Sequence, residues 1–172
     1  MGALRPFFAL MRKNIRSMTH GAVLAAAYVA LTHLQNLLLP GSASWAIQFR
    51  VSEVLCVLAF FTPAAVPGLT VGCLIFNLTS GMALPLDFLV GSLATLLATG
   101  AMRLLRKWPL LGLLMPALFN SFLVGWELSV YIGGGFWLNA LYVAIGEAAV
   151  LLILGWPLYR AICSRDLGSF FR

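Results

Sequence analysis

The chain has 172 residues, of which 62% are hydrophobic and 9% are charged, and its mean hydropathy is +0.98. Soluble domains carry about 25% charged residues, so this composition excludes a globular protein in water, a disordered chain and a polar nucleic-acid-binding protein. Because most of the chain must lie in lipid, we expect the net charge of +6 to orient it in a membrane and not to bind nucleic acid.

Residues 1–17 are predicted to form a basic amphipathic N-terminal segment. Apolar side chains recur at helical spacing from Leu4 to Ile15, with basic side chains among them. This pattern favours a helix lying on the anionic inner leaflet. The alternative is a disordered basic tail that only sets the topology. The apolar run from Phe7 to Met11 is too short for a signal peptide, which needs about 7–15 apolar residues.

Six apolar stretches follow, and they predict an all-α membrane domain over residues 18–162 with a cytoplasmic tail at 163–172. A helix needs about 20 residues to cross the hydrocarbon core, so four of the six stretches are long enough. The second and third are short and are separated by Pro63 and Pro67, so they form either two short spans or a re-entrant hairpin shielded by other helices. The stretches are 18–39, 51–63, 66–80, 84–105, 109–132 and 136–162.

The basic residues predict the orientation of this six-helix bundle. Ten of the 11 Lys and Arg residues fall on one side of the membrane, and only Arg50 lies on the other. The positive-inside rule therefore puts both chain ends in the cytoplasm. The ten are Arg5, Arg12, Lys13, Arg16, Arg103, Arg106, Lys107, Arg160, Arg165 and Arg172.

Four of the five acidic residues lie inside the apolar stretches. Each such group costs about 2.5–3.5 kcal/mol on insertion scales, so each is a candidate functional residue. The topology puts Glu53, Asp87 and Glu127 in the outer third of the bilayer and Glu147 near its middle. For Asp87 and Glu53 the alternative is a favourable charge at a helix N-terminus. The spacing of Arg50 and Glu53 also permits a structural ion pair.

Polar residues on the fifth and sixth helices are predicted to share two faces that meet in an outward-facing pocket. Residues three or four apart lie on one face of a helix. The first face is Asn120, Val124, Glu127 and Tyr131, and the second is Asn139, Val143 and Glu147. Asn77 lies near the outer end of the third stretch and is expected to join them.

Aromatic residues are expected to rim this pocket. Trp45, Trp126, Phe136 and Trp137 lie at its predicted mouth, and Tyr131 ends the first face. Trp45, Trp126, Tyr131 and Trp137 are therefore candidates for stacking on a flat substrate. The alternative is that the Trp residues only anchor the protein at the membrane interface.

The predicted pocket suits a flat, polar heterocycle with a guanine-like edge. A carboxylate accepts two parallel N–H bonds, and a carboxamide reads the remaining edge. A multiply charged anion fits badly because one Arg faces up to four acids, whereas a cationic substrate or a coupled cation remains an alternative. The sequence has no metal-ligand pattern and no phosphate loop, so we expect no bound metal or cofactor and no ATP hydrolysis by this chain.

Small residues form a stripe on the first helix. Ala22, Ala26 and Ala30 recur at every fourth position, and Gly68 and Gly72 repeat the pattern in the third stretch. Such stripes let helices approach closely. The Ala stripe is a candidate docking face for a membrane partner, and the alternative is ordinary packing inside the bundle.

Several motifs resemble the QueT family, the substrate-binding S components of energy-coupling factor (ECF) transporters for queuosine precursors. The resemblance runs in order from about residue 18 to residue 160. It rests on Q-F-R-V-S-E-V-L at 48–55, P-G-L-T-V-G-C-L-I-F-N-L at 67–78, D-F-L-V-G-S-L-A-T-L at 87–96, and the later Asn120, Glu127 and Gly146-Glu147.

The resemblance implies a six-helix subunit that captures a deazaguanine-type base or its nucleoside from outside. It implies two kinds of partner, a scaffold membrane subunit and two ATPase subunits that use the ATP, and a tilt of the subunit in the membrane to release substrate. It also implies a multi-pass protein of a prokaryotic plasma membrane, with docking through Ala22 and Ala26. The implied pocket residues are Arg50, Glu53, Asn77, Asp87, Asn120, Glu127 and Glu147.

Other functions remain alternatives to uptake of queuosine precursors. One is an S component for another vitamin, and another is a stand-alone carrier in which the acids bind Na⁺ or protons. An intramembrane enzyme is disfavoured, because His20 lies away from the outer acids and no nucleophile is paired with a base.

Overall fold

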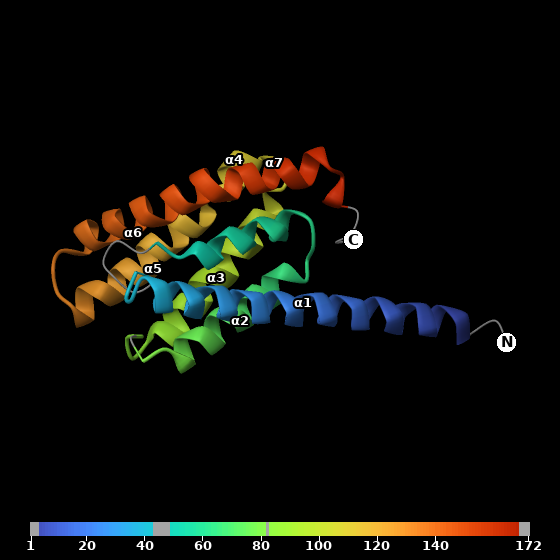
Figure 1. Ribbon diagram of the computed structural model, residues 1–172, viewed down its shortest axis with the longest axis horizontal. Coiled ribbons are helices and arrows are strands. Elements are labelled where there is room, and N and C mark those ends of the chain that lie inside the picture. Colours follow the sequence, from blue (N-terminus) through green and yellow to red (C-terminus); the bar gives the residue numbers. More distant parts are fainter. Residues whose placement is uncertain (1–3, 43–48, 82, 169–172) are drawn as a thin grey trace.

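The structure, a computed structural model, describes residues 4–42, 49–81 and 83–168, and the side chains of residues 4–13 are not included in that description. Every regular element in these ranges is helical, and the helices form an elongated bundle (Figure 1). The elements are α1 (Leu4–Leu38), the 3₁₀ helix η1 (Val51–Phe60), α2 (Ala65–Thr79), α3 (Asp87–Leu104), α4 (Pro109–Leu113), α5 (Met115–Tyr131), α6 (Phe136–Val150), the π-helical turn η2 (Leu151–Gly155) and α7 (Trp156–Ser164).

Four helical segments are long and apolar enough to cross a membrane, as the sequence predicted. They are Asn14–Leu38, Asp87–Leu104, Pro109–Tyr131 and Phe136–Ser164. The two short stretches form the short apolar helices η1 and α2. An all-helical bundle with four segments long and apolar enough to span a membrane is therefore confirmed, whereas six full spans and cytoplasmic chain ends stay predictions.

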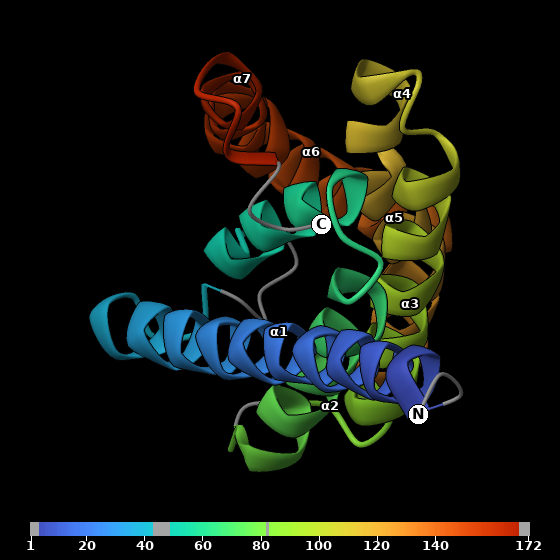
Figure 2. The same ribbon diagram turned by 90° about the vertical axis from the view of Figure 1, so that its right-hand side faces the viewer.

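The helix η1 is wound more tightly than an α-helix. A 3₁₀ helix rises about 2.0 Å per residue, so its 10 residues reach about 20 Å, against about 15 Å for the same residues in an α-helix. Seven of these residues are buried. Figure 2 shows η1 between α1 and α6, and it also contacts α3. This short segment therefore carries its side chains into the middle of the bundle.

Two of the long segments change their winding near a proline. Pro116 removes a backbone donor one turn after Gly112, and α4 ends at Leu113 just before α5 begins. In the last segment the π-helical turn η2 ends at Gly155, two residues before Pro157. A proline in a helix removes one hydrogen bond, and a π turn is one way to accommodate that loss.

The helices α1 and α2 approach closely because glycines line their contact. A Cβ atom on Gly68 would lie 2.6 Å from the carbonyl oxygen of Gly21, and one on Gly72 would lie 2.9 Å from the carbonyl oxygen of Ala25. The predicted role of Gly68 and Gly72 in close helix packing is therefore confirmed.

Replacing Gly68 by alanine is expected to destabilise the protein by about 1–3 kcal/mol, because the new methyl group meets the backbone of Gly21, which cannot rotate away. Thermal unfolding in detergent micelles measures the effect. The matched control is Gly100→Ala on α3, where a Cβ meets nothing within 4 Å and helix propensity favours alanine by about 1 kcal/mol. Equal stability of the two variants would contradict the close α1–α2 contact.

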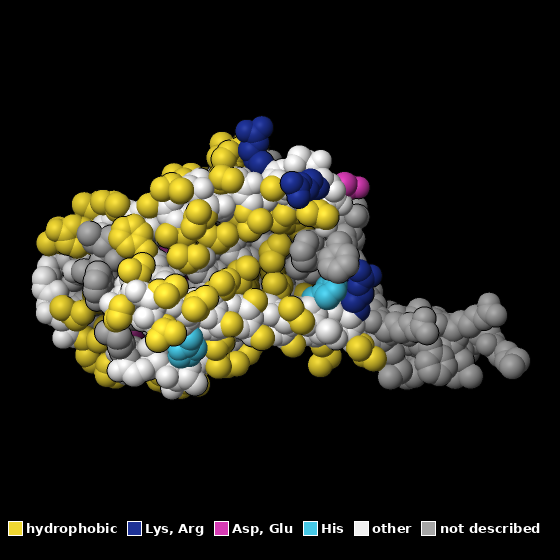
Figure 3. All heavy atoms as spheres, viewed as in Figure 1, with side chains coloured by type: hydrophobic (Ala, Val, Ile, Leu, Met, Phe, Trp, Pro, Cys, Tyr) yellow, Lys and Arg dark blue, Asp and Glu magenta, His cyan; other side chains and the backbone are white. Residues whose placement is uncertain are grey.

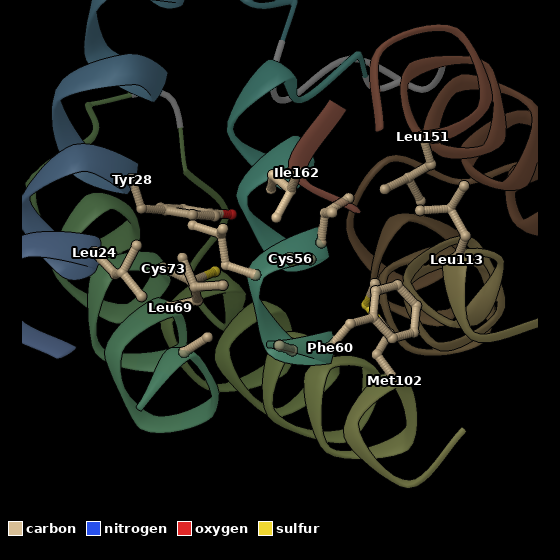
Figure 4. Packing of buried hydrophobic residues seen from close by; sticks show 14 of the residues in the cluster. Leu24, Tyr28, Cys56, Phe60, Leu69, Cys73, Met102, Leu113, Leu151 and Ile162 are labelled. Carbon is tan, nitrogen blue, oxygen red and sulfur yellow. The ribbon is translucent and has the colours of Figure 1, made fainter. Parts of the chain in front are cut away.

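The buried apolar side chains form two clusters. Figure 4 shows the larger one, in which Tyr28 of α1, Cys56 of η1 and Leu151 of η2 come together from distant parts of the chain. The smaller cluster lies where α3, α5 and α6 meet and contains Val90, Val124, Leu128 and Val143. The polar residues described below lie on the same elements.

The ends of the described chain lie at one end of the bundle. The N-terminal part of α1 and the end of α7 are both at the right of Figure 1, and the Lys and Arg side chains on the face in Figure 3 gather toward that end. Hydrophobic side chains cover much of this face. The predicted boundary at residue 17 falls inside the continuous helix α1, in which no proline or glycine occurs between Pro6 and Gly21.

Candidate functional site

The seven polar residues predicted to form the pocket are all buried. None is more than 5% exposed, although they come from separate elements. Arg50 immediately precedes η1, which carries Glu53, and Asp87 is the first residue of α3. Asn77 is on α2, Asn120 and Glu127 are on α5, and Glu147 is on α6.

Arg50 lies among the buried acids. Its guanidinium interacts electrostatically with Asp87 and Glu147. Gly91 leaves room for it, since a Cβ on Gly91 would lie 3.7 Å from Nη1 of Arg50 and 2.7 Å from Nδ2 of Asn77. Arg50 is the only basic side chain buried within the described ranges.

Glu53 is held by hydrogen bonds from the protein. The Tyr28 hydroxyl donates to Oε1 at 2.7 Å, and the Cys56 thiol donates to Oε2 at 3.0 Å. Both carboxylate oxygens therefore have partners, one of them across the α1–η1 contact. This arrangement favours a bracing role for Glu53.

Asp87 and Asn77 hold the connection between α2 and α3. The backbone N–H of Leu84 donates to Oδ2 of Asp87 at 2.7 Å, and the Asn77 side chain donates from Nδ2 to the Asp87 carbonyl oxygen at 2.7 Å. In each side chain the remaining Oδ1 atom is buried without a hydrogen bond to any described residue. In each side chain, one polar atom thus holds the α2–α3 connection, and the Oδ1 atom is left to bond a group outside the described residues.

Asn120, Glu127 and Glu147 differ from the others because none of their side-chain polar atoms forms a hydrogen bond of normal geometry within residues 4–42, 49–81 and 83–168, although the Glu127 carboxylate lies beside the Asp87 side chain and the backbone of Leu86. An unsatisfied buried polar group costs about 1–3 kcal/mol, and more if charged, so native proteins contain few of them. Three such side chains on two neighbouring helices are typical of a site that completes its hydrogen bonds with a ligand or with bound protons.

The two predicted polar faces meet. Asn120, Val124 and Glu127 are buried on α5, as are Asn139, Val143 and Glu147 on α6, and Val124 packs in one cluster with Val143.

The helices α5 and α6 are closest at Gly125 and Ala140, since a Cβ on Gly125 would lie 2.8 Å from Cα of Ala140. This contact shows which residues of the two helices lie at the same height along the helix axes. Counting from this contact along the antiparallel helices at about 1.5 Å per residue, Asn120 and Glu147 lie within about 3 Å of the same level.

The aromatic residues predicted to stack on substrate lie outside the buried polar group. Trp126 is 48% exposed, Tyr131 43% and Trp137 75%. Trp126 directly precedes Glu127 and so points about 100° away from it around the helix. The structure does not bring these side chains together with the acids, and their positions favour membrane-interface anchors. Trp45 lies outside the described residues.

The sequence reasoning missed a polar face on α1. Tyr28, Thr32 and Gln35 are buried at the spacing i, i+4 and i+7, and this periodicity could have revealed them. The Thr32 hydroxyl donates to the carbonyl oxygen of Tyr28 and is hydrogen-bonded to the Ser52 hydroxyl, each at 2.7 Å. The Gln35 carboxamide donates to the hydroxyl of Ser42 and to the carbonyl oxygen of Phe49, and it accepts from the N–H of Val51 at 2.8 Å. Gln35 therefore holds the backbone on both sides of Arg50.

Replacing Gln35 by leucine is expected to lower the free energy of unfolding by about 2 kcal/mol, because leucine leaves the Phe49 carbonyl and the Val51 N–H without their partner. The neighbouring Asn36→Leu is the matched control. Its side-chain oxygen has no described hydrogen bond, so it should change stability by less than about 0.5 kcal/mol. Thermal unfolding of both variants in micelles tests this, and a larger loss in Asn36→Leu would contradict it.

The Ala stripe on α1 is uncovered. Ala22, Ala26 and Ala30 are exposed, whereas Gly21 and Ala25 face α2. A shallow apolar groove of about 280 Å³ runs beside the stripe and is lined by Ser17, Met18, Gly21, Ala22, Ala25, Pro67, Gly68 and Val71. The alternative that the stripe packs inside the bundle is therefore wrong for the isolated chain.

No group of three or more His, Cys, Asp or Glu side chains within the described ranges has the geometry to hold a metal ion.

The comparisons with known proteins agree with the motif resemblance. The family model described as QueT transporter matches residues 18–164. The queuosine precursor transporter QueT of Lactococcus lactis subsp. cremoris (strain MG1363) is 42% identical over 76 residues, which cover 44% of this chain and 42% of that protein. No solved structure matches the chain. Four of its helical segments are long and apolar enough to cross a membrane, and from the extent of the family match the chain belongs to the QueT transporter family.

Proposed function

We propose that the chain captures a queuosine precursor, a deazaguanine-type base or its nucleoside, at the buried polar residues of η1, α3, α5 and α6. The observation that carries this proposal is the set of buried side chains Asn120, Glu127 and Glu147, whose polar atoms form no hydrogen bond of normal geometry with a described residue. The name of the Lactococcus relative supports the substrate class.

The chemistry of these side chains suits a guanine-like edge. A carboxylate accepts two parallel N–H groups, and the carboxamide of Asn120 offers both a donor and an acceptor. Arg50 offsets part of the negative charge through its interaction with Asp87 and Glu147. A neutral heterocycle that donates N–H groups therefore satisfies the pocket, whereas an anion adds to its charge.

Equilibrium binding to the purified full chain tests the substrate class. We expect tight binding of queuine-like bases or nucleosides, and weak binding of riboflavin, thiamine and biotin. A deazapurine without the 2-amino group is the matched probe, and its affinity should fall by at least about tenfold because the carboxylate loses a donor. Tight binding of one of the vitamins, with none of the deazaguanines bound, would contradict the proposal.

We propose further that the chain is an S component that works with a scaffold subunit and two ATPase subunits in a prokaryotic plasma membrane. In this scheme both chain ends are cytoplasmic, the partner subunits use ATP, and the chain tilts in the membrane to release its substrate. The exposed stripe of Ala22, Ala26 and Ala30 supports a close helix contact with the scaffold.

Substitution in the stripe separates docking from binding. Ala26→Leu is expected to abolish co-purification with the scaffold while leaving substrate affinity unchanged, because the Ala26 side chain is exposed whereas the acids are buried. Val23→Leu, an exposed position beside the stripe, is the control. Co-purification of the Ala26 variant at the normal yield would contradict docking through this face.

A stand-alone ion-coupled carrier is the second candidate, because four buried acids face one buried base in the described ranges. Proteoliposomes that contain only this chain distinguish the two. Uptake driven by an ion gradient favours the carrier, whereas strict dependence on added scaffold and ATPase subunits excludes it.

A further inference from the structure

We propose that the end of the bundle near the chain ends carries a binding site for an anionic phospholipid. Five residues line a cavity of about 490 Å³ there: Phe60 and Phe61 at the end of η1, Arg103 and Arg106 at the end of α3, and Tyr159 of α7. This cavity is separate from the buried acids and has the opposite charge. The inference does not depend on the proposed substrate.

The two arginines supply the charge that a phosphate group needs. Arg103 donates from Nη1 to the carbonyl oxygen of Phe60 at 3.0 Å, which fixes one edge of its guanidinium and leaves further N–H donors of the same plane beside the cavity. Arg106 follows three residues later and is exposed. Paired guanidinium groups bind phosphate oxygens with charge-assisted hydrogen bonds.

Acidic side chains are scarce at this end. Among the acids in the described ranges, Asp166 is exposed near the end of the chain, whereas Glu53, Asp87, Glu127 and Glu147 are buried inside the bundle. Lys107, Arg160 and Arg165 are exposed at the same end as the cavity. The net field at the cavity therefore favours an anion.

A second, apolar groove is linked to the cavity through a pair of stacked rings. It has a volume of about 310 Å³ and is lined by Lys107, Trp108, Pro109, Leu110, Leu111 and Trp156. The Trp156 ring stacks on the Tyr159 ring that lines the cavity, with centroids 5.6 Å apart and planes at 15°.

The stacked pair of Trp156 and Tyr159 therefore joins the arginine-lined cavity to the apolar groove. The exposed Trp108 is of the residue type that sits at the headgroup level of a bilayer. This order of polarity matches a phospholipid, with its headgroup phosphate at the arginines and an acyl chain along the groove. Basic pockets between helices at a cytoplasmic surface commonly bind such headgroups. A free phosphate ion would use the arginines but would gain nothing from the groove.

The test uses the full chain, delipidated in a neutral detergent and titrated with phosphatidylglycerol or with phosphatidylcholine of the same acyl chains, followed by native mass spectrometry. We expect the wild type to prefer phosphatidylglycerol. Arg106→Gln should weaken its binding by about fivefold to tenfold, and Arg106→Lys should retain most of it. The control Arg160→Gln removes an exposed charge on α7 that does not line the cavity, and it should change the affinity by less than about twofold.

A second variant tests the groove and distinguishes lipid from phosphate. Trp108→Ala should weaken binding of long-chain phosphatidylglycerol but not of its dihexanoyl analogue, because only the long chain reaches the groove. Equal affinity for the two lipid classes, equal losses in the Arg106 and Arg160 variants, or displacement of the lipid by equimolar inorganic phosphate would each overturn the proposal. Both Arg106 and Trp108 are exposed, so their variants are expected to fold, and thermal unfolding verifies this.

Discussion

Replacing Glu147 by glutamine is expected to weaken binding of the queuosine precursor by more than about tenfold. Glu147 is fully buried, and neither of its oxygens accepts a hydrogen bond from a described residue. In the proposed complex these oxygens accept the N–H groups of the guanine-like edge. Glutamine keeps the size of the side chain but offers one acceptor and one donor, so one substrate N–H faces an N–H group.

The same substitution is expected to leave the fold intact. The Glu147 carboxylate is attracted by Arg50 and repelled by Glu53, so these two effects partly cancel. The free energy of unfolding should therefore change by less than about 1 kcal/mol. A loss of affinity with unchanged stability is the pattern of a residue that contacts ligand.

Isothermal titration calorimetry with the purified variant measures the affinity, and thermal unfolding measures the stability. Asp166→Asn is the control, because it removes a carboxylate that is exposed and outside the polar pocket. It should bind the precursor as the wild type does. An affinity of Glu147→Gln equal to that of the wild type would remove Glu147 from the site.

Most of the correct predictions about the fold follow from the length and the periodicity of the apolar stretches. The four long spans follow from apolar length alone. The buried faces of α5 and α6 follow from the helical repeat, which places Asn120 with Glu127 and Asn139 with Glu147. Tyr131 departs from its face because it is the last residue of α5, where the helix no longer faces its neighbours.

Features that depend on distant contacts could not be predicted from the pattern. An apolar run such as that of η1 is compatible with an α-helix and with a 3₁₀ helix. The sequence therefore does not reveal that η1 is the longer of the two forms. The bond from Tyr28 to Glu53 joins residues 25 positions apart. The burial of Gln35 follows from helical periodicity, but its partners, which lie in the following loop and at the start of η1, could not be predicted. In each case tertiary packing, and not local preference, decides the partner.

Unlike the loss of the Glu147 carboxylate, which is expected to affect ligand affinity, the loss of Arg50 is expected to affect mainly the stability of the fold. Arg50→Met should lower the free energy of unfolding by about 3–5 kcal/mol, because it keeps the apolar volume but leaves buried carboxylates without their cation. The control Arg106→Met removes an exposed charge and should change stability by less than about 0.5 kcal/mol.

A second substitution tests whether the loss in Arg50→Met comes from the uncompensated acids. In the double variant Arg50→Met with Glu147→Gln, one of the carboxylates that interact with Arg50 is neutral, so the double variant should be more stable than Arg50→Met alone by about 1 kcal/mol or more. Chemical unfolding in mixed micelles measures the four corners of this cycle. If the two single effects simply add, Arg50 and Glu147 are not coupled, and Arg50 must stabilise the bundle through Asp87 and the α2–α3 connection instead.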